Sequence, residues 1–259
     1  MFKGLIVPII TPRKNSQFDI ESFEKLMNFL IERRVDAIFV LGTTGEFLKL
    51  SLEEKKMIIS ACIPFVDKVS ILIGVSADTV EETEELIGVA NKMKSFAVVL
   101  TPMVGQGEVA EKIELALNHS NLPILLYNNP AIQGGMNLDL DIIKKYSANP
   151  KIIGIKDSSS DSDYNNQLIE ISSDNFLFFQ GSESEFINSS NKKTAGLVAG
   201  SANVYPDEFK KLIENPNSEI FHKIKELKNN IKKISPNSVH NMKVLLKEMG
   251  VIKSDEIYG

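Results

Sequence analysis

The sequence predicts an α/β fold, a (β/α)8 TIM barrel with a short C-terminal helical extension. Eight short apolar runs alternate with helical patterns along the chain. Each run is continuously apolar, which is typical of parallel strands covered on both faces. The length of 259 residues suits a single barrel domain. An open doubly wound sheet would show the same alternation, and the count of eight favours the closed barrel.

The expected strands stop where small or polar residues begin. They cover residues 4–10, 37–41, 71–75, 96–100, 123–127, 152–156, 176–179 and 195–199. The expected helices have apolar residues three and four positions apart. They cover 19–34, two stretches that begin at the capping signals of Ser51 and Thr79, and 108–118, 138–147, 162–172, 183–192 and 206–214. Residues 1–216 are therefore assigned to the barrel, and residues 217–259 to a helical extension of the same domain.

Composition narrows the classes of function. Hydrophobic residues make up 43% of the chain and charged residues 24%, so a large core can be buried. The net charge of −5 provides no basic excess for nucleic acid. The N-terminal apolar run is too short for a signal peptide or a membrane span, so we expect a cytoplasmic protein with no membrane partner.

Lys156 ends an apolar strand, and the catalytic groups of such barrels come from the C-terminal ends of strands. Burial disfavours the charged form of an amine there, which suits a nucleophile that captures a carbonyl. The alternative is a lysine whose amine reaches solvent as the strand ends. Tyr127 ends the preceding strand, and adjacent strands lie about 4.8 Å apart. The two side chains can therefore converge on one substrate, with the phenol moving protons.

The second expected strand is followed by Gly-Thr-Thr-Gly-Glu at residues 42–46. The hydroxyls of Thr43 and Thr44, with backbone N–H groups, offer a neutral way to bind a carboxylate. An ordinary tight turn is the alternative reading of these residues. No arginine lies beyond residue 34, so no guanidinium later in the chain can hold an anion.

Metal chemistry is a weaker alternative. No pair of histidines has the spacing of metal ligands. The carboxylates at the strand ends that could hold a divalent ion are those of Glu46, Asp157 and Glu183.

Four motifs together resemble the pyruvate-dependent class I aldolase superfamily. This superfamily includes dihydrodipicolinate synthases, N-acetylneuraminate lyases and archaeal 2-keto-3-deoxygluconate aldolases. The motifs are GTTGE at 42–46, YNNP at 127–130, GIKD at 154–157 and GSAN at 200–203. The resemblance implies a (β/α)8 barrel, usually a homotetramer, with small-molecule substrates and with no metal or organic cofactor.

The resemblance also implies roles for individual residues. Lys156 is similar to the lysine that forms a Schiff base with pyruvate, and Tyr127 to the phenol that moves protons. Thr43 and Thr44 match a hydroxyl pair, one near the tyrosine and one on the carboxylate of pyruvate. The resemblance therefore implies that both bind substrate and that Thr43 is catalytic together with Lys156 and Tyr127. Gly181 and Val198 match positions whose backbone groups line the pyruvate pocket. Three further substrate-binding positions match residues that contact substrate hydroxyls in sugar-acid aldolases: Ser158, Glu183 and Ser201.

Two departures from the synthase pattern bear on the substrate. Ile132 stands where dihydrodipicolinate synthases have an arginine for the carboxylate of the second substrate. Met103 stands near the position of a typical tyrosine, and residues 103–108 hold no basic side chain for a phosphate. We therefore expect a lyase that cleaves 2-keto-3-deoxygluconate, or a similar sugar acid, to pyruvate and glyceraldehyde. A dihydrodipicolinate synthase acting on aspartate semialdehyde and a non-catalytic pyruvate-binding barrel are the alternatives.

Overall fold

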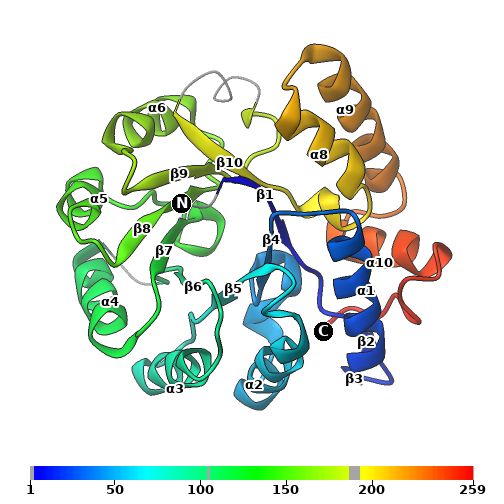
Figure 1. Cartoon of the computed structure of the whole chain (residues 1–259), viewed down its shortest axis with the longest axis horizontal. Helices are drawn as coiled ribbons and strands as arrows, with labels where there is room; N and C mark the ends of the chain where they lie inside the picture. The colour runs from blue at the N-terminus through cyan, green and yellow to red at the C-terminus, as the bar shows by residue number, and fades with distance from the viewer. Residues whose placement is uncertain (1–2, 104–105, 187–192, 259) are drawn as a thin grey trace. The chain divides into compact units, whose positions relative to one another are not determined.

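The strands of the chain form a closed barrel (Figure 1). The structure, a computed structural model, describes residues 3–103, 106–186 and 193–258. The barrel strands are β1 (Gly4–Pro8), β4 (Ala37–Val40), β5 (Ser70–Gly74), β6 (Ala97–Leu100), β7 (Ile124–Asn128), β8 (Ile152–Asp157), β9 (Leu177–Gln180) and β10 (Thr194–Val198). Their order around the barrel is β1-β10-β9-β8-β7-β6-β5-β4. The predicted eight-stranded barrel is confirmed.

Helices follow most of the strands, as the sequence pattern predicts. They are α1 (Ile20–Glu32), α2 (Leu52–Ala61), α3 (Val80–Asn91), α4 (Gln106–His119), α5 (Leu140–Ser147), α6 (Ser162–Ile171), α8 (Pro206–Glu214), α9 (Ser218–Lys232) and α10 (Ser238–Glu248). Among the described residues, no helix has the length and apolar character needed to cross a membrane. The helix expected at 183–192 falls largely on residues 187–192, which lie outside the described residues.

The chain divides into two compact units. The central unit comprises Leu72–Val198 with Met1–Lys3, and the terminal unit comprises Gly4–Ile71 and Ala199–Gly259. In the central unit, β6, β7, β8 and β9 pair in parallel, and α4, α5 and α6 lie on their outer side (Figure 1). In the terminal unit, β1 pairs with β4 and is joined by α1, α2 and the C-terminal helices.

Both predicted capping signals start helices. The Ser51 hydroxyl accepts a hydrogen bond from the amide of Glu54 at 3.2 Å, and the Glu54 carboxylate accepts one from the amide of Ser51 at 3.1 Å. At α3, the Thr79 hydroxyl accepts from the amide of Glu82 at 3.1 Å. Each of these bonds satisfies an amide that the first turn of a helix leaves without a partner.

Strand β1 ends at Pro8, two residues before the predicted end. The buried side chain of Asn203 explains the difference. Its Oδ1 accepts from the amide of Ile10 at 3.1 Å, and its Nδ2 donates to the carbonyl of Pro8 at 2.8 Å. An amide side chain thus replaces a neighbouring strand as the partner of the backbone here.

Two features outside the barrel add to the sequence expectation. A hairpin of two-residue strands, β2 (Arg13–Lys14) and β3 (Gln17–Phe18), was not predicted, because such short strands have no detectable periodicity. The C-terminal extension is helical, and it consists of two helices, α9 and α10. They are separated by a stretch that contains Pro236, and proline interrupts a helix by removing an amide donor.

Gly154 lies in β8 opposite Leu177 of the neighbouring strand β9. Its φ is 157°, and a Cβ atom at this position would collide with the backbone of Leu177. The β7–β8 register shifts just before it, between Ile124 and Leu125. A residue with no side chain is therefore required two positions before Lys156.

We expect Gly154→Ala to lower the free energy of unfolding by about 3 kcal/mol or more, because the backbone of β9 must move to accept a methyl group. Gly88→Ala is the matched control. Gly88 lies in α3, and a Cβ there meets nothing within 4 Å. Alanine at this position should therefore raise the free energy of unfolding by about 0.5–1 kcal/mol, because glycine is a poor helix former. Urea unfolding measures both. Equal stability of wild type and Gly154→Ala would contradict the assigned packing.

After α10, the chain runs to Tyr258 without a helix or strand (the C-terminal segment, residues 249–258). Its carboxylates tie it to the terminal unit. Asp255 pairs with Lys247 at 2.6 Å. The Glu256 carboxylate accepts from the amides of Asn15 and Ser16, each at 3.0 Å.

We expect acid to release the C-terminal segment before the rest of the protein unfolds. The hydrogen bond from Lys247 lowers the pKa of Asp255, and amide hydrogen bonds from Ser16 and Asn15 lower the pKa of Glu256. A lowered carboxyl pKa contributes stability that is present above the unfolded pKa, here 3.8 and 4.5, and is lost as the pH falls through the lowered value. Pepsin should therefore cut within 249–258 first as the pH is reduced below 4.5. Simultaneous cleavage of the barrel would contradict this expectation.

Candidate active site

Strands β7 and β8 place a tyrosine and a lysine side by side. Tyr127 is in register with Lys156, and the next pair is Asn128 with Asp157. Paired residues on adjacent strands point to the same side of a sheet. Lys156 is 5% exposed and Tyr127 3% exposed, so both are almost fully buried.

The amine of Lys156 lies over the aromatic ring of Tyr127. The distance from Nζ to the ring centroid is 3.7 Å, which is a cation–π contact. A solvated lysine, the alternative that the sequence left open, does not describe this side chain. The structure thus brings two of the three predicted catalytic residues, Lys156 and Tyr127, together, and their chemical roles stay predictions.

Asn129 holds the phenol, and the sequence did not single it out. Its Nδ2 donates to the Tyr127 Oη at 2.9 Å. Its backbone amide donates to Gln133 Oε1 at 2.6 Å, and Gln133 Nε2 donates to the carbonyl of Pro102 at 2.9 Å. All these groups are buried, so the phenolic oxygen has a fixed donor beside it.

A second buried polar cluster lies at the ends of β7, β8 and β9. Asp157 is 0% exposed, and its carboxylate accepts from Asn128 Nδ2 at 2.5 Å and from Asn165 Nδ2 at 2.9 Å. Gln180 at the end of β9 donates to Asn165. Burial raises the pKa of Asp157, while the hydrogen bonds from Asn128 and its neighbours oppose that rise. The cluster fixes the strand end that carries Lys156.

The other predicted residues of the central unit surround these strand ends. Ser158 directly follows β8, and its amide donates to the carbonyl of Asn128 at 3.0 Å. Gly181 follows β9, and a Cβ there would collide with Ser158 Oγ and the carbonyl of Asp157. Glycine is therefore needed at 181 for close backbone approach. Glu183 and Val198, the last residue of β10, are both buried.

Thr43, Thr44 and Ser201 belong to the terminal unit. Thr43 and Thr44 lie in a 3-10 turn (Thr43–Gly45) directly after β4, and Thr43 is exposed. The amide of Gly45 donates to the carbonyl of Gly42 at 2.9 Å, so part of the predicted N–H array is used within the turn. Gly200 lies beside Thr44, since a Cβ at 200 would stand 3.5 Å from Thr44 Oγ1.

The carboxylates proposed as metal ligands have other partners. Glu46 pairs with Lys243 at 2.6 Å, and Asp157 accepts from amide side chains. Among the residues that the structure describes, no group of three or more histidine, cysteine, aspartate or glutamate side chains is placed to hold a metal ion.

A barrel with a buried lysine against a tyrosine at the C-terminal ends of adjacent strands defines a candidate imine-forming enzyme. The model of the dihydrodipicolinate synthetase family matches residues 1–257. The 4-hydroxy-tetrahydrodipicolinate synthase of Staphylococcus carnosus is 30% identical over 221 residues, covering 83% of this chain and 74% of the relative.

Two solved structures are similar over the whole chain. Dihydrodipicolinate synthase from Bacteroides thetaiotaomicron has a TM-score of 0.92 at 27% identity, covering 100% of this chain and 92% of that one. YagE, a prophage protein of E. coli K12 solved with pyruvate, has a TM-score of 0.88 at 25% identity, with the same coverage. The chain belongs to the dihydrodipicolinate synthetase family, and it is an enzyme of the pyruvate-dependent class I aldolase type.

Proposed function

We propose that the enzyme forms a Schiff base between Lys156 and pyruvate. Nζ adds to C2 of pyruvate, and loss of water gives the imine. Loss of a proton from C3 gives an enamine, which attacks the carbonyl carbon of an aldehyde and forms the new carbon–carbon bond. Hydrolysis of the imine then releases the product and restores the amine, and the reverse sequence cleaves the same bond.

The observation that carries this proposal is the position of Lys156 Nζ, 3.7 Å from the centroid of the Tyr127 ring. A phenol whose ring lies against the amine can donate a proton to the departing hydroxyl and take one from the substrate. The hydrogen bond from Asn129 to Tyr127 Oη supports this role, because a donor at the phenolic oxygen stabilises the charge that develops as its proton leaves.

The remaining predicted residues complete the proposal. The hydroxyls of Thr43 and Thr44 would bind the carboxylate of pyruvate and support the proton relay, and backbone groups at Gly181 and Val198 would line its pocket. The GTTGE motif and the close backbone approach at Gly181 support these roles. Contacts to the acceptor are assigned to Ser158, Glu183 and Ser201.

For the acceptor aldehyde, the relatives and the site residues favour different candidates. The names of the relatives favour aspartate semialdehyde, and this is the first candidate. The second is glyceraldehyde, released from 2-keto-3-deoxygluconate. It is favoured by Ile132, which replaces a carboxylate-binding arginine, and by the lack of any arginine beyond residue 34. No guanidinium of the central unit can therefore bind an acceptor carboxylate.

A panel of aldehydes tests the proposal. Pyruvate consumption is measured with aspartate semialdehyde, glyceraldehyde and glyceraldehyde 3-phosphate. The highest kcat/KM with aspartate semialdehyde supports the first candidate, and the highest with glyceraldehyde supports the second. Failure of all three aldehydes to consume pyruvate would overturn the proposed function. On the basis of the resemblance, we also propose that the protein is cytoplasmic and forms a homotetramer. Analytical ultracentrifugation measures the oligomeric state.

Ile132→Arg should shift the preference toward aspartate semialdehyde. A charge-assisted hydrogen bond to the acceptor carboxylate is worth about 1.5–3 kcal/mol, or about tenfold to a hundredfold in relative kcat/KM. Ile132→Met is the control, because it keeps an apolar side chain and should leave the ratio unchanged. An unchanged ratio in the arginine variant would show that residue 132 does not face the acceptor.

A further inference from the structure

The turn that carries Thr43 and Thr44 is followed by a residue in an unusual conformation. Glu46 has φ 58° and ψ 31°, in the left-handed region that non-glycine residues seldom adopt. Its amide donates to the carbonyl of Thr43 at 3.0 Å, which closes the turn. Its side chain is only 7% exposed, so a carboxylate is buried three residues after Thr43.

Lys243 of α10 provides the opposite charge. Its side chain is 0% exposed, and its Nζ donates to Glu46 Oε2 at 2.6 Å and to the carbonyl of Glu256 at 2.8 Å. Burial lowers the pKa of Lys243, and the Glu46 carboxylate opposes that shift. A buried ion pair contributes little net stability, because desolvation offsets the attraction. Its clearest effect is to fix the position of the groups it joins.

The C-terminal segment holds the other carboxylate oxygen. The amide of Tyr258 donates to Glu46 Oε1 at 3.1 Å, and Lys49 Nζ donates to the carbonyl of Tyr258 at 2.7 Å. The Tyr258 ring is buried, with the Arg13 guanidinium 4.3 Å from its centroid. Lys243 and Tyr258, which lie 197 and 212 positions after Glu46, therefore converge on this one glutamate.

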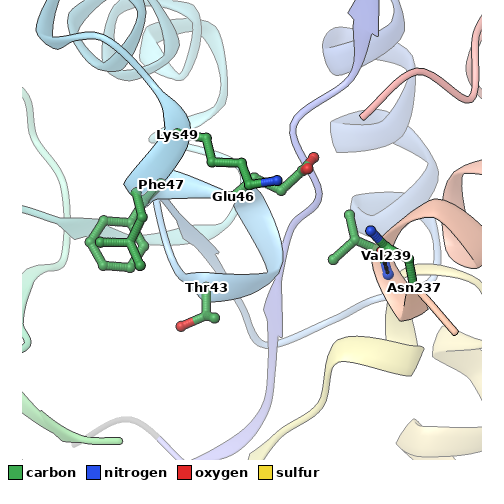
Figure 2. A pocket seen from close by; sticks show the side chains of 7 residues that line it. Thr43, Glu46, Phe47, Lys49, Asn237 and Val239 are labelled. Carbon is green, nitrogen blue, oxygen red and sulfur yellow. Dashed lines mark hydrogen bonds between the residues drawn. The ribbon is translucent and has the colours of Figure 1, made fainter. Parts of the chain in front are cut away.

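A pocket lies next to these contacts. It has a volume of about 230 Å³, and it is lined by Thr43, Glu46, Phe47, Leu48, Lys49, Asn237 and Val239. Figure 2 shows the segment of Thr43, Glu46 and Lys49 facing Asn237 and Val239 at the start of α10. The wall beside Thr43 is therefore built by the same helix that supplies Lys243.

We infer that Lys243 and the C-terminal segment are positioning elements that set the Thr43–Thr44 turn through Glu46. The inference rests on the proposed function in one respect, namely that this turn binds the carboxylate of pyruvate. Neither Lys243 nor Tyr258 is assigned a contact with substrate. An ion pair that served stability alone would affect unfolding without changing the affinity for pyruvate.

Lys243→Met tests the inference, because it removes the ammonium and keeps most of the side-chain volume. We expect the KM for pyruvate to rise about tenfold with a smaller change in kcat. This pattern is typical of losing an enzyme–substrate interaction that is equally strong in the ground state and in the transition state. The rise in KM caused by Lys243→Met should not add to the rise caused by Thr44→Val, which removes the hydroxyl that the turn positions. In the Thr44→Val background, Lys243→Met should therefore add little.

Lys210→Met is the matched control. Lys210 also forms an ion pair in the terminal unit, with Asp36 at 2.9 Å, but Asp36 precedes β4 whereas Thr43 follows it. This variant should lose stability and keep its KM. Tyr258→Ala serves as a second test variant, because it loosens the C-terminal segment without leaving a buried charge.

Hydrogen exchange separates this inference from the proposed function. In Lys243→Met or Tyr258→Ala, the amide of Glu46 should exchange about tenfold faster relative to amides of β4, and in Lys210→Met it should not. Unchanged exchange, or additive effects with Thr44→Val, would overturn the positioning role. Failure of the wild type to be trapped on pyruvate by reduction would overturn the proposed function instead, while the exchange result would still decide the role of Lys243.

Discussion

Lys156→Met should lower kcat at least about 10⁴-fold, because it removes the amine that we propose forms the covalent intermediate with pyruvate. Methionine retains the length and apolar stem of lysine, so it can fill the space over the Tyr127 ring. The fold should therefore persist, as circular dichroism and urea unfolding can verify. Kinetics with saturating pyruvate measures the loss.

Lys151→Met is the control for the nucleophile. Lys151 directly precedes β8, and its Nζ donates to the carbonyl of Leu117 at 2.8 Å. It thus lies on the same segment but makes a structural contact. This variant should retain kcat within about threefold, since it removes one ordinary hydrogen bond. A Lys156 variant as active as the Lys151 variant would refute covalent catalysis at residue 156.

Tyr127→Phe should lower kcat about 10²- to 10⁴-fold, the usual contribution of a general acid or base. The ring that contacts Lys156 Nζ is retained, so the amine should keep its position. The variant should still form the pyruvate imine, but more slowly. Stopped-flow measurement of imine formation separates this step from carbon–carbon bond formation.

Tyr146→Phe is the control for the loss of a phenol. Tyr146 on α5 is buried, and its hydroxyl donates to the Glu114 carboxylate at 2.7 Å. Burial, together with Glu114, raises the pKa of Tyr146 to about 12. Its replacement should reduce stability slightly and leave kcat unchanged. Equal kcat in Tyr127→Phe and the wild type would rule out the phenol as the proton carrier.

The barrel could be predicted because its strands are buried on both faces. A run such as Ile152–Ile155 must then be apolar at every position, and the run stands out in a single sequence. The exact last residue of a strand does not stand out in the same way. Strand β8 continues to Asp157, one residue beyond the predicted end, because Asn128 and Asn165 satisfy the buried carboxylate.

The site was predicted only where a side chain has distinctive chemistry. A lysine or a tyrosine at the end of an apolar run is unusual enough to be noticed. Asn129 and Gln133 are not, because amides are common in loops and their partners are set by tertiary structure. The signal that could have found them is the row of polar residues after β7, which a solvated loop equally explains.

Long-range partners were beyond sequence reasoning. Lys243 lies in a lysine-rich helical stretch and has the same local pattern as its solvated neighbours. Its burial depends on Glu46, nearly two hundred residues earlier. Nothing local in the sequence marks that pair, although a glutamate directly after the Gly-Thr-Thr-Gly turn indicates a site.

The central claim is that Lys156 is the residue that captures pyruvate. Reduction with borohydride in the presence of pyruvate, followed by peptide mass mapping, tests it most directly. We expect one carboxyethyl group on the amine of Lys156 in the wild type, a slower reaction in Tyr127→Phe and no adduct in Lys156→Met. An adduct on another lysine, or none on the wild type, would contradict it.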